Sequence, residues 1–334
     1  MAEALVTGAT GLLGSYVAER LLADGWTVRA LVRDPARASW LATQGVALHT
    51  GDVLDAASLG AAAHGCDIIV HAAAAIFHAE GWAGYERSNV VGTDNVVEAT
   101  RSSGARLVHV SSVAVYGPGS RYRPDGALTA EDAALQPIPP GANYARSKRE
   151  SETRVLHAHR EGRIWATAVR PCVIYGRRDR QFVPRMAKLI RRAVIPMVNG
   201  GHSTMAVVHA ANVADGIVRA ATNDVAGGRA WNLTNDFPVT VREFFTLGAQ
   251  GLGTRLRTVP VPGWLARSGA TLVDGIAPLV GIDRSVTSAR SSVDFISRNN
   301  PFTSERARSE LGWSPSVSHE IGVPDAFAWW RRQG

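Results

Sequence analysis

Short apolar runs alternate with amphipathic segments along the first half of the chain. The apolar runs begin at about residue 4 and recur at 27–32, 46–50, 67–71 and 106–110. Between them, apolar residues recur at helical spacing in 15–23, 56–63 and 84–102. Strands that alternate with helices form parallel sheets, because each right-handed crossover lays a helix on one face. The pattern therefore predicts an α/β fold, a Rossmann-type doubly wound parallel sheet.

The first apolar run leads into a glycine-spaced turn and then a helix. Gly8 allows a tight turn, Gly11 lets the backbone approach a pyrophosphate, and Gly14 lets the helix pack closely on the sheet. Free N–H groups at the positive end of the helix then face an anion. The turn predicts dinucleotide binding, against the alternative of a purely structural turn. The residues expected to contact the cofactor are Gly8, Thr10, Gly11, Leu12, Leu13 and Gly14.

The residue that follows the second strand bears on the choice of cofactor. An acidic residue there would accept hydrogen bonds from a ribose 2′-OH, whereas an arginine pairs with a 2′-phosphate. Arg33 occupies this position and is followed by Asp34. We expect NADP(H) to be preferred. NAD(H) remains possible, because Arg33 could be solvated and Asp34 could supply the carboxylate.

Two further strand ends carry candidate cofactor contacts. Asp52, followed by Val53, stands where an adenine edge could be read, or else caps a turn with nearby polar residues. After the fourth strand, the small side chains of Ala72, Ala73 and Ala74 admit a flat ligand against the backbone. His71, at the end of that strand, is interpreted as a packed histidine and not as a catalyst.

Hydroxyl groups and a tyrosine–lysine pair carry the candidate chemistry. Ser111 and Ser112 follow the fifth strand, at the edge where ligands of such sheets bind. Tyr144 and Lys148 are four residues apart, hence on one face of a helix. A neighbouring ammonium favours the phenolate and lowers the pKa of a tyrosine toward the working range. The alternative is an exposed pair on an ordinary helix.

The chain resembles the extended short-chain dehydrogenases/reductases, also called the NAD-dependent epimerase/dehydratase superfamily, almost from end to end. The matching motifs are Thr7-Gly8-Ala9-Thr10-Gly11-Leu12-Leu13-Gly14, Gly51-Asp52-Val53, His71-Ala72-Ala73-Ala74, Asn89-Val90-Val91-Gly92-Thr93, Ser111-Ser112 with Tyr116-Gly117, Tyr144 with Lys148, Arg170-Pro171 with Tyr175-Gly176, and Glu310-Leu311-Gly312-Trp313. Together these motifs are specific.

The resemblance implies roles for individual residues. Tyr144 would be the acid/base, and Lys148 would hold the nicotinamide ribose and tune Tyr144. Ser112 would position the carbonyl, since the catalytic Ser/Thr of the family stands four residues before the tyrosine of its Tyr-Gly pair, here Tyr116. Asn89 would support the site. The cofactor contacts implied by the resemblance include Tyr144, Lys148, Pro171 and Val173.

Other motifs are similar to two branches of this superfamily. The sequence after the second strand looks like the dihydroflavonol reductases, and 208–214 and 300–313 look like the 3β-hydroxysteroid dehydrogenases. Both imply an NADP(H)-dependent oxidoreductase that interconverts a ketone and a secondary alcohol on an apolar small molecule. Two alternatives remain: a sugar-nucleotide epimerase with tightly held NAD, and a non-catalytic dinucleotide sensor. Asn212, where many sugar-nucleotide enzymes carry Asp, weakens the epimerase reading.

The second half of the chain lacks the regular alternation. Irregular stretches at 194–203, 224–229 and 260–297 suggest a small discontinuous substrate lobe. We expect 1–170 to form the dinucleotide-binding domain, to which 204–222 return, and 171–203 with 223–334 to form mainly the substrate lobe. The apolar residues Trp264, Leu265, Leu272, Val273, Ile276, Leu279, Val280 and Ile282 would line a lid or pack a C-terminal core.

A basic segment at 177–192 leaves its role open. It could bind a diphosphate or coenzyme A, or form an amphipathic lid helix with a solvated basic face. The latter is preferred.

Composition narrows the remaining classes. The 334 residues are 46% hydrophobic and 19% charged, with a formal charge of +7. The arginines are dispersed, so nucleic-acid binding is not expected. With only two cysteines, no signal peptide and no long apolar run, we expect a cytoplasmic protein without a membrane span. No metal site is expected. Family members commonly pair two long helices as a four-helix interface, so 84–102 and the helix of Tyr144 predict a homodimer.

Overall fold

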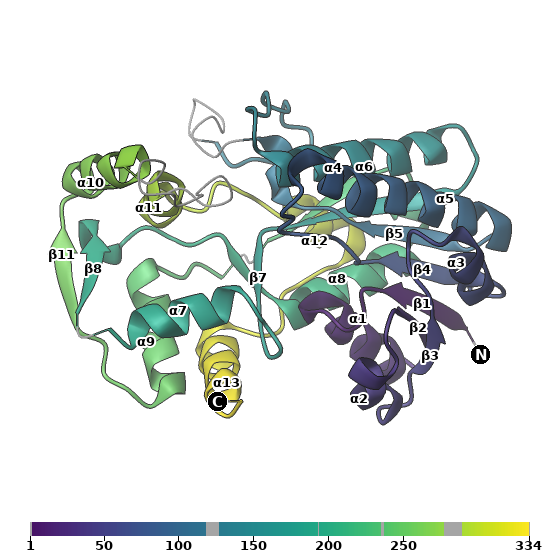
Figure 1. Ribbon diagram of the computed structural model, residues 1–334, viewed down its shortest axis with the longest axis horizontal. Coiled ribbons are helices and arrows are strands. Elements are labelled where there is room, and N and C mark those ends of the chain that lie inside the picture. The colour runs from purple at the N-terminus through teal and green to yellow at the C-terminus, as the bar shows by residue number, and fades with distance from the viewer. Residues whose placement is uncertain (1, 118–126, 193, 235–236, 277–288, 334) are drawn as a thin grey trace.

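The computed structural model describes residues 2–117, 127–192, 194–234, 237–276 and 289–333 (Figure 1). A large sheet with helices on both faces forms one lobe, and a smaller lobe lies beside it. Within the described residues, no helix is both long enough and apolar enough to cross a membrane.

The large sheet has seven strands in the order β10-β6-β5-β4-β1-β2-β3, and every neighbouring pair is parallel. Its strands are β1 (Glu3–Thr7), β2 (Thr27–Val32), β3 (Ala47–Thr50), β4 (Ile68–His71), β5 (Arg106–Val110), β6 (Trp165–Pro171) and β10 (Ala230–Leu233). The predicted doubly wound fold is confirmed. The strand order reverses between β1 and β4, which places a ligand crevice at their carboxyl ends.

Helices cover both faces because side chains alternate along each buried strand. In β1, Val6 packs into one core with α1 (Leu12–Ala23), α2 (Ser39–Ala42) and α8 (Ala210–Thr222). Leu5 packs into the other core with α3 (Ala56–Ala63), α5 (Gly92–Ser103) and α6 (Asn143–Arg160). The chain is apolar on both faces of its central strands, as the apolar runs predicted.

Two helices differ from their predicted bounds. The helix expected at 15–23 begins earlier, at Leu12, because Gly11 serves as its N-cap. The segment expected as one helix at 84–102 is divided into α4 (Gly81–Tyr85), a π-helical turn η2 (Glu86–Val91) and α5. Single π turns recur at functional sites, and this one carries Asn89.

The smaller lobe is built around a separate core of apolar side chains. Its elements are β7 (Val173–Tyr175), α7 (Phe182–Ile190), β8 (Ile195–Val198), β9 (Val207–His209), α9 (Val241–Leu252), β11 (Thr258–Val261), α10 (Gly263–Ile276), α11 (Ala289–Ser297) and α13 (His319–Arg331). Two short parallel pairs, β7 with β9 and β8 with β11, give it its sheet structure.

Parts of the C-terminal half return to the large sheet. The strand β10 lies inside 223–334 but pairs with β6, and α12 (Glu305–Leu311) packs beside it. Trp313 is buried and donates its indole N–H to the carbonyl of Asn212. The amide of Asn212 accepts from the backbone N–H groups of Ser316 and Val317 and donates to the carbonyl of Val317. Asn212 therefore has a structural role that an aspartate, with no N–H to give, could fill only in part.

Candidate active site

The glycine turn has no room for side chains. Gly8 has φ +74°, and a Cβ there would lie 2.7 Å from the backbone nitrogen of Ala73. A Cβ on Gly14 would lie 2.3 Å from the carbonyl oxygen of Gly8. Because Gly11 caps α1 without a side-chain hydrogen bond, the N–H groups of the first helical turn are left for a ligand. This arrangement fits the pyrophosphate of a dinucleotide.

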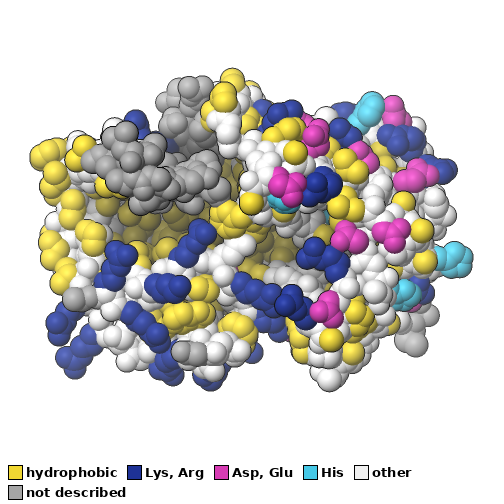
Figure 2. Space-filling model, viewed as in Figure 1, with side chains coloured by type: hydrophobic (Ala, Val, Ile, Leu, Met, Phe, Trp, Pro, Cys, Tyr) yellow, Lys and Arg dark blue, Asp and Glu magenta, His cyan; other side chains and the backbone are white. Residues whose placement is uncertain are grey.

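A cavity of about 1000 Å³ extends from this turn into the space between the two lobes. Figure 2 shows the hollow, with hydrophobic side chains along its floor. Of the residues predicted from the sequence, those that line it are Gly8, Thr10, Gly11, Leu12, Leu13, Gly14, Ala72, Ala74, Ser112, Tyr144, Lys148, Pro171 and Val173. The cavity volume is at the upper end for small-molecule sites, enough for part of a dinucleotide together with a substrate.

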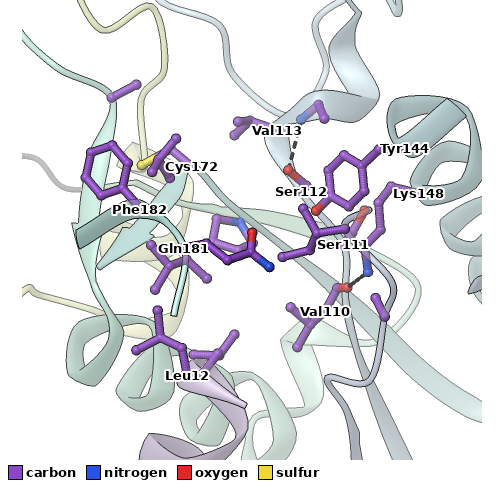
Figure 3. Close-up of a pocket in the computed structure, with 18 of the residues that line it drawn as sticks. Leu12, Val110, Ser111, Ser112, Val113, Tyr144, Lys148, Cys172, Gln181 and Phe182 are labelled. Atoms are coloured by element: carbon purple, nitrogen blue, oxygen red, sulfur yellow. Dashed lines mark hydrogen bonds between the residues drawn. The ribbon is translucent and has the colours of Figure 1, made fainter. Parts of the chain in front are cut away.

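Ser112, Tyr144 and Lys148 meet on one wall of this cavity, with Gln181 and Phe182 on the wall across from them (Figure 3). Ser112 ends the extended segment after β5, and the other two lie on the first turns of α6. The Tyr144 hydroxyl shares a hydrogen bond with the Ser112 side chain. The Lys148 ammonium donates to the carbonyl oxygen of Val110 over 2.7 Å. The structure therefore brings together the three residues that the sequence singled out.

Burial dominates the electrostatics of this wall. It raises the pKa of Tyr144, an effect that the hydrogen bond with Ser112 partly opposes. Burial also lowers the pKa of Lys148 to about 8, with Glu152 acting in the opposite direction. The expected lowering of the Tyr144 pKa is therefore wrong for the protein without ligands, because desolvation outweighs any help from the lysine. At neutral pH the phenol holds its proton and the lysine is charged.

Two buried histidines stand behind Lys148. His71 bonds to the hydroxyls of Thr7, at 2.8 Å, and Thr93, at 3.1 Å. Nε2 of His109 lies 3.1 Å from the Ser151 hydroxyl. Burial lowers the pKa of His71 to about 3, and it also lowers the pKa of His109. Both rings are therefore neutral, and His71 is packed, as the sequence indicated.

Asn89 lies behind the cavity wall. Its side chain accepts from the backbone N–H of Ala75 at 2.7 Å and donates to the carbonyl of the same residue at 2.9 Å. It also donates to the Ser147 hydroxyl at 2.9 Å, which in turn bonds to the carbonyl of Tyr144. Asn89 thus ties the loop after β4 to the first turn of α6.

The remaining predicted contacts lie outside the cavity lining. They are Arg33, Asp52, Val53 and Ala73. The Asp52 carboxylate accepts from the backbone N–H of Leu54, so it has a local turn role. Asp34 accepts from the N–H of Ala36 and lies 3.7 Å from Arg37, while Arg33 is exposed.

Comparisons with known proteins agree with this geometry. The family model described as "NAD dependent epimerase/dehydratase family" matches residues 4–234. The chain belongs to this family. It is an extended short-chain dehydrogenase/reductase, an NAD(P)-dependent enzyme of the dehydrogenase/reductase class.

Similar family members bear the names of oxidoreductases. A 4-hydroxy-2-methyl-3-oxo-4-farnesyl-3,4-dihydroquinoline-1-oxide ketoreductase of Stigmatella aurantiaca is 32% identical, over 95% of this chain and 93% of its own length. A 2-alkyl-3-oxoalkanoate reductase of Stenotrophomonas maltophilia (strain K279a) is 28% identical, with 96% of both chains covered. The crystal structure of gox2253 matches with a TM-score of 0.78 and 27% identity, over 100% of this chain and 99% of that one.

The extended short-chain enzyme has further cavity residues to which the sequence assigned no definite role. Ser111 presents a buried hydroxyl without a hydrogen-bond partner among the described residues. Arg178 has φ 70°, a conformation that non-glycine residues rarely adopt, and forms a 2.7 Å ion pair with Glu19. Its guanidinium lies over the rings of Tyr16 and Trp40. The basic segment was a signal for Arg178, but its spacing could not show which arginine faces the cavity.

The C-terminal segments also differ from expectation. The helix α7 buries Val183, Ala187 and Ile190, in agreement with an amphipathic helix, and two arginines just before it, Arg178 and Arg180, line the cavity. The residues expected to line a lid or to pack a core, Trp264, Leu265, Leu272 and Val273, are exposed instead. Both alternatives are wrong for these four, because α10 turns only part of its surface toward the lobe. Leu279, Val280 and Ile282 lie outside the described residues.

Proposed function

We propose that this chain is an NADP(H)-dependent oxidoreductase that interconverts a ketone and a secondary alcohol on a relatively apolar small molecule. The observation that carries the proposal is the Ser112–Tyr144–Lys148 wall, which faces a large cavity with Phe182, Phe295 and Phe302 among its lining. A polar reactive wall opposite aromatic side chains suits a carbonyl on an apolar body. The names of the relatives support it, since they include a ketoreductase and a 3-oxoalkanoate reductase.

The side chains of this wall can bind the oxygen of the substrate and transfer a proton to it. In the direction of reduction, Tyr144 gives its proton to the carbonyl oxygen, and its raised pKa means that the proton is present at neutral pH. Ser112 donates a hydrogen bond to the same oxygen. The Lys148 charge stabilises the phenolate that remains. When bound, the nicotinamide supplies or accepts the hydride.

The residues around the glycine turn would hold the cofactor. The first turn of α1 receives the pyrophosphate, and Lys148 holds the ribose of the nicotinamide. Arg33, which is exposed and has no ion pair among the described residues, would attract a 2′-phosphate, whereas Asp34 is engaged by its own turn and by Arg37. The unpaired Arg33 and the engaged Asp34 support a preference for NADP(H).

The test is a panel of ketones presented to the purified protein with NADPH and, separately, with NADH. We expect consumption of NADPH with ring-bearing or long-chain ketones, and slower consumption of NADH. Failure of every ketone and every matching alcohol, with the cofactor still bound, would contradict the assignment and favour a non-catalytic sensor.

A sugar-nucleotide epimerase is the second candidate. The observation that favours it is Arg180, an exposed cavity-lining arginine without an ion pair among the described residues, which could hold a diphosphate. Firmly bound oxidised NAD in the purified protein, together with binding of UDP or dTDP, would move the assignment to this class.

We also propose a homodimer that pairs α5 and α6. The outer face of α6 carries charged side chains, with Arg146 paired to Glu150 and Arg154 paired to Asp94 of α5, so the interface would be polar. Light scattering at micromolar concentration is expected to give the mass of two chains. A monomer would contradict this.

A further inference from the structure

The far end of the smaller lobe exposes an unusual set of apolar side chains. On α10, Trp264 is 70% exposed, Leu265 48%, Leu272 64% and Val273 43%. Trp264 and Leu265 lie on the first turn of α10 and Leu272 and Val273 about two turns later, so apolar side chains are exposed over about half of the helix circumference. We name these four residues the α10 stripe. Large apolar residues scattered singly on a surface need no explanation, but several exposed on one helix suggest an interaction site.

The strands next to α10 extend the apolar surface. Val259 of β11 and Val194, just before β8, are 51% and 48% exposed. The two strands pair in parallel, and α10 follows β11 directly, with the N–H of Gly263 bonded to the Asn199 side chain. In Figure 2 hydrophobic side chains gather at this end of the molecule, where Figure 1 places α10 and β11.

A group of arginines lies just before the N-terminal ends of the same two strands. Arg191 and Arg192 precede β8, and Arg255 and Arg257 precede β11. All four are exposed, and none forms an ion pair among the described residues; we name them the arginine group. Some exposed arginines elsewhere are paired with acids, as Arg101 is with Glu98, and others, such as Arg33 and Arg180, have no ion pair among the described residues. Figure 2 shows Lys and Arg side chains below the apolar ones at the same end of the molecule.

We propose that this end of the smaller lobe docks on the surface of an anionic lipid bilayer. The α10 stripe enters the boundary between headgroups and acyl chains, as the apolar faces of interfacial helices do. The arginine group lies one strand length away and pairs with lipid phosphates, because unneutralised guanidinium groups bind phosphate bidentately. Charge complementarity therefore indicates a negatively charged occupant. The protruding apolar helix indicates a fluid occupant, such as a bilayer, whose molecules can rearrange around Trp264.

A second copy of the chain fits this surface poorly. A two-fold interface brings the same patch of both copies together, so each arginine group could be neutralised only by acids of that same patch. The described acids near α10 are already engaged: Asp294 lies near Arg267 and Arg298, and Asp274 accepts from the backbone N–H groups of Ala289 and Arg290. They leave the arginine group without neutralising partners.

The docking surface is next to the cavity. The helix α10 packs on α11, and Phe295 and Asp294 of α11 line the cavity wall. An apolar ligand dissolved in the bilayer would therefore meet the protein at the lobe that encloses the cavity. The docking itself does not depend on which ligand the enzyme uses, so its test is independent of the proposed function.

The test is sedimentation of the whole protein with vesicles of phosphatidylcholine alone, or with one part phosphatidylglycerol to two parts phosphatidylcholine. We expect binding to the anionic vesicles, weakened by salt, and little binding to the neutral ones. Trp264→Ser with Leu272→Ser should weaken binding at least about tenfold. Ile321→Ser, which changes a residue 66% exposed on α13, is the matched control and should bind as the wild type does.

A second pair of variants tests the charges. Arg255→Gln with Arg257→Gln should weaken binding about tenfold, since each basic side chain adds attraction to an anionic surface. Arg37→Gln with Arg160→Gln, on the large lobe, should leave it unchanged. The proposal is overturned if no vesicle binds the wild type, if the stripe variant binds as well as the wild type, or if light scattering shows a wild-type dimer that the stripe variant loses. Circular dichroism confirms that each variant is folded.

Discussion

The ammonium of Lys148 bonds to the carbonyl oxygen of Val110, on the last residue of β5, over 2.7 Å. This bond joins α6 to the strand from which Ser111 and Ser112 extend. It therefore fixes the position of the Lys148 ammonium relative to the two serine hydroxyls. It also places a cation in a buried position, where desolvation lowers the pKa of Lys148 to about 8 from an ordinary value of 10.5. The site therefore keeps its charge at a cost in stability.

The free-energy cost of burying the Lys148 cation predicts that the difference in stability between the wild type and Lys148→Met changes with pH. The fold disfavours the charged lysine, so the destabilisation is fully present below pH ~8 and is relieved as pH rises toward ~10.5. At ~1.4 kcal/mol for each pKa unit, wild type should gain up to ~3 kcal/mol relative to Lys148→Met between pH 7 and pH 10.5. Urea unfolding at several pH values measures it. A constant difference would show that Lys148 is not buried as a cation.

Arg33→Asp should reverse the choice of cofactor. An aspartate repels a 2′-phosphate and accepts from a ribose 2′-OH, so NADPH affinity should fall about tenfold or more while NADH affinity rises. Arg37→Gln is the control, since its side chain is 86% exposed and pairs with Asp34. Fluorescence titration gives both dissociation constants. An unchanged ratio in Arg33→Asp, or tighter binding of NADH by the wild type, would remove the basis for an NADP preference.

Glu152 should stabilise α6 one turn beyond Lys148. It forms a buried, doubly hydrogen-bonded ion pair with Arg170 of β6, which also bonds to the Tyr116 hydroxyl at 2.8 Å. Glu152→Ala would leave that guanidinium uncompensated, at a loss of ~3–5 kcal/mol in the free energy of unfolding. Glu150→Ala, which removes an exposed pair with Arg146, should cost under ~1 kcal/mol. Equal losses in urea unfolding would contradict the buried pair.

Asn89 should affect turnover indirectly, because it positions the first turn of α6 relative to the loop after β4. Asn89→Ala removes both hydrogen bonds to the Ala75 backbone and the bond to Ser147, which frees the loop after β4 from the first turn of α6. We expect kcat to fall about tenfold, with a loss of ~1–3 kcal/mol in stability from the unpaired backbone groups. Asn95→Ala, which loses one bond to the Val53 carbonyl, should retain its kcat. A full kcat in Asn89→Ala would assign Asn89 to the fold alone.

The sequence predicted the lobe of the large sheet well because the patterns that indicate its strands and helices lie within each element. Strands at 27–32 and 106–110 and the helix at 56–63 match their observed bounds, since apolar runs and helical spacing repeat within each element. The start of α1 was missed because Gly11 caps it without a polar side chain. The π-helical turn that carries Asn89 has no periodic signal of its own.

The rest of the cavity could not be predicted because it depends on distant contacts. Phe182, Phe295 and Phe302 come from three separate segments that meet only after β7 pairs with β9 and the chain returns to the large sheet. The exposure of Trp264 had no local signal either, since an amphipathic pattern fits a lid, a core or a docking face equally. Tyr144 and Lys148 were predictable because their spacing lies within one helix.

The turnover of Tyr144→Phe tests the account most directly. If Tyr144 transfers the proton, the variant should keep its cofactor affinity while kcat falls ~10²- to 10⁴-fold, and Ser112→Ala should lose less because it forfeits one hydrogen bond to the developing alkoxide. Tyr85→Phe removes another phenol, bonded to the Ile76 carbonyl at 2.7 Å, and should stay near wild type. A Tyr144→Phe enzyme with wild-type turnover would contradict the assignment of this wall as the reactive site.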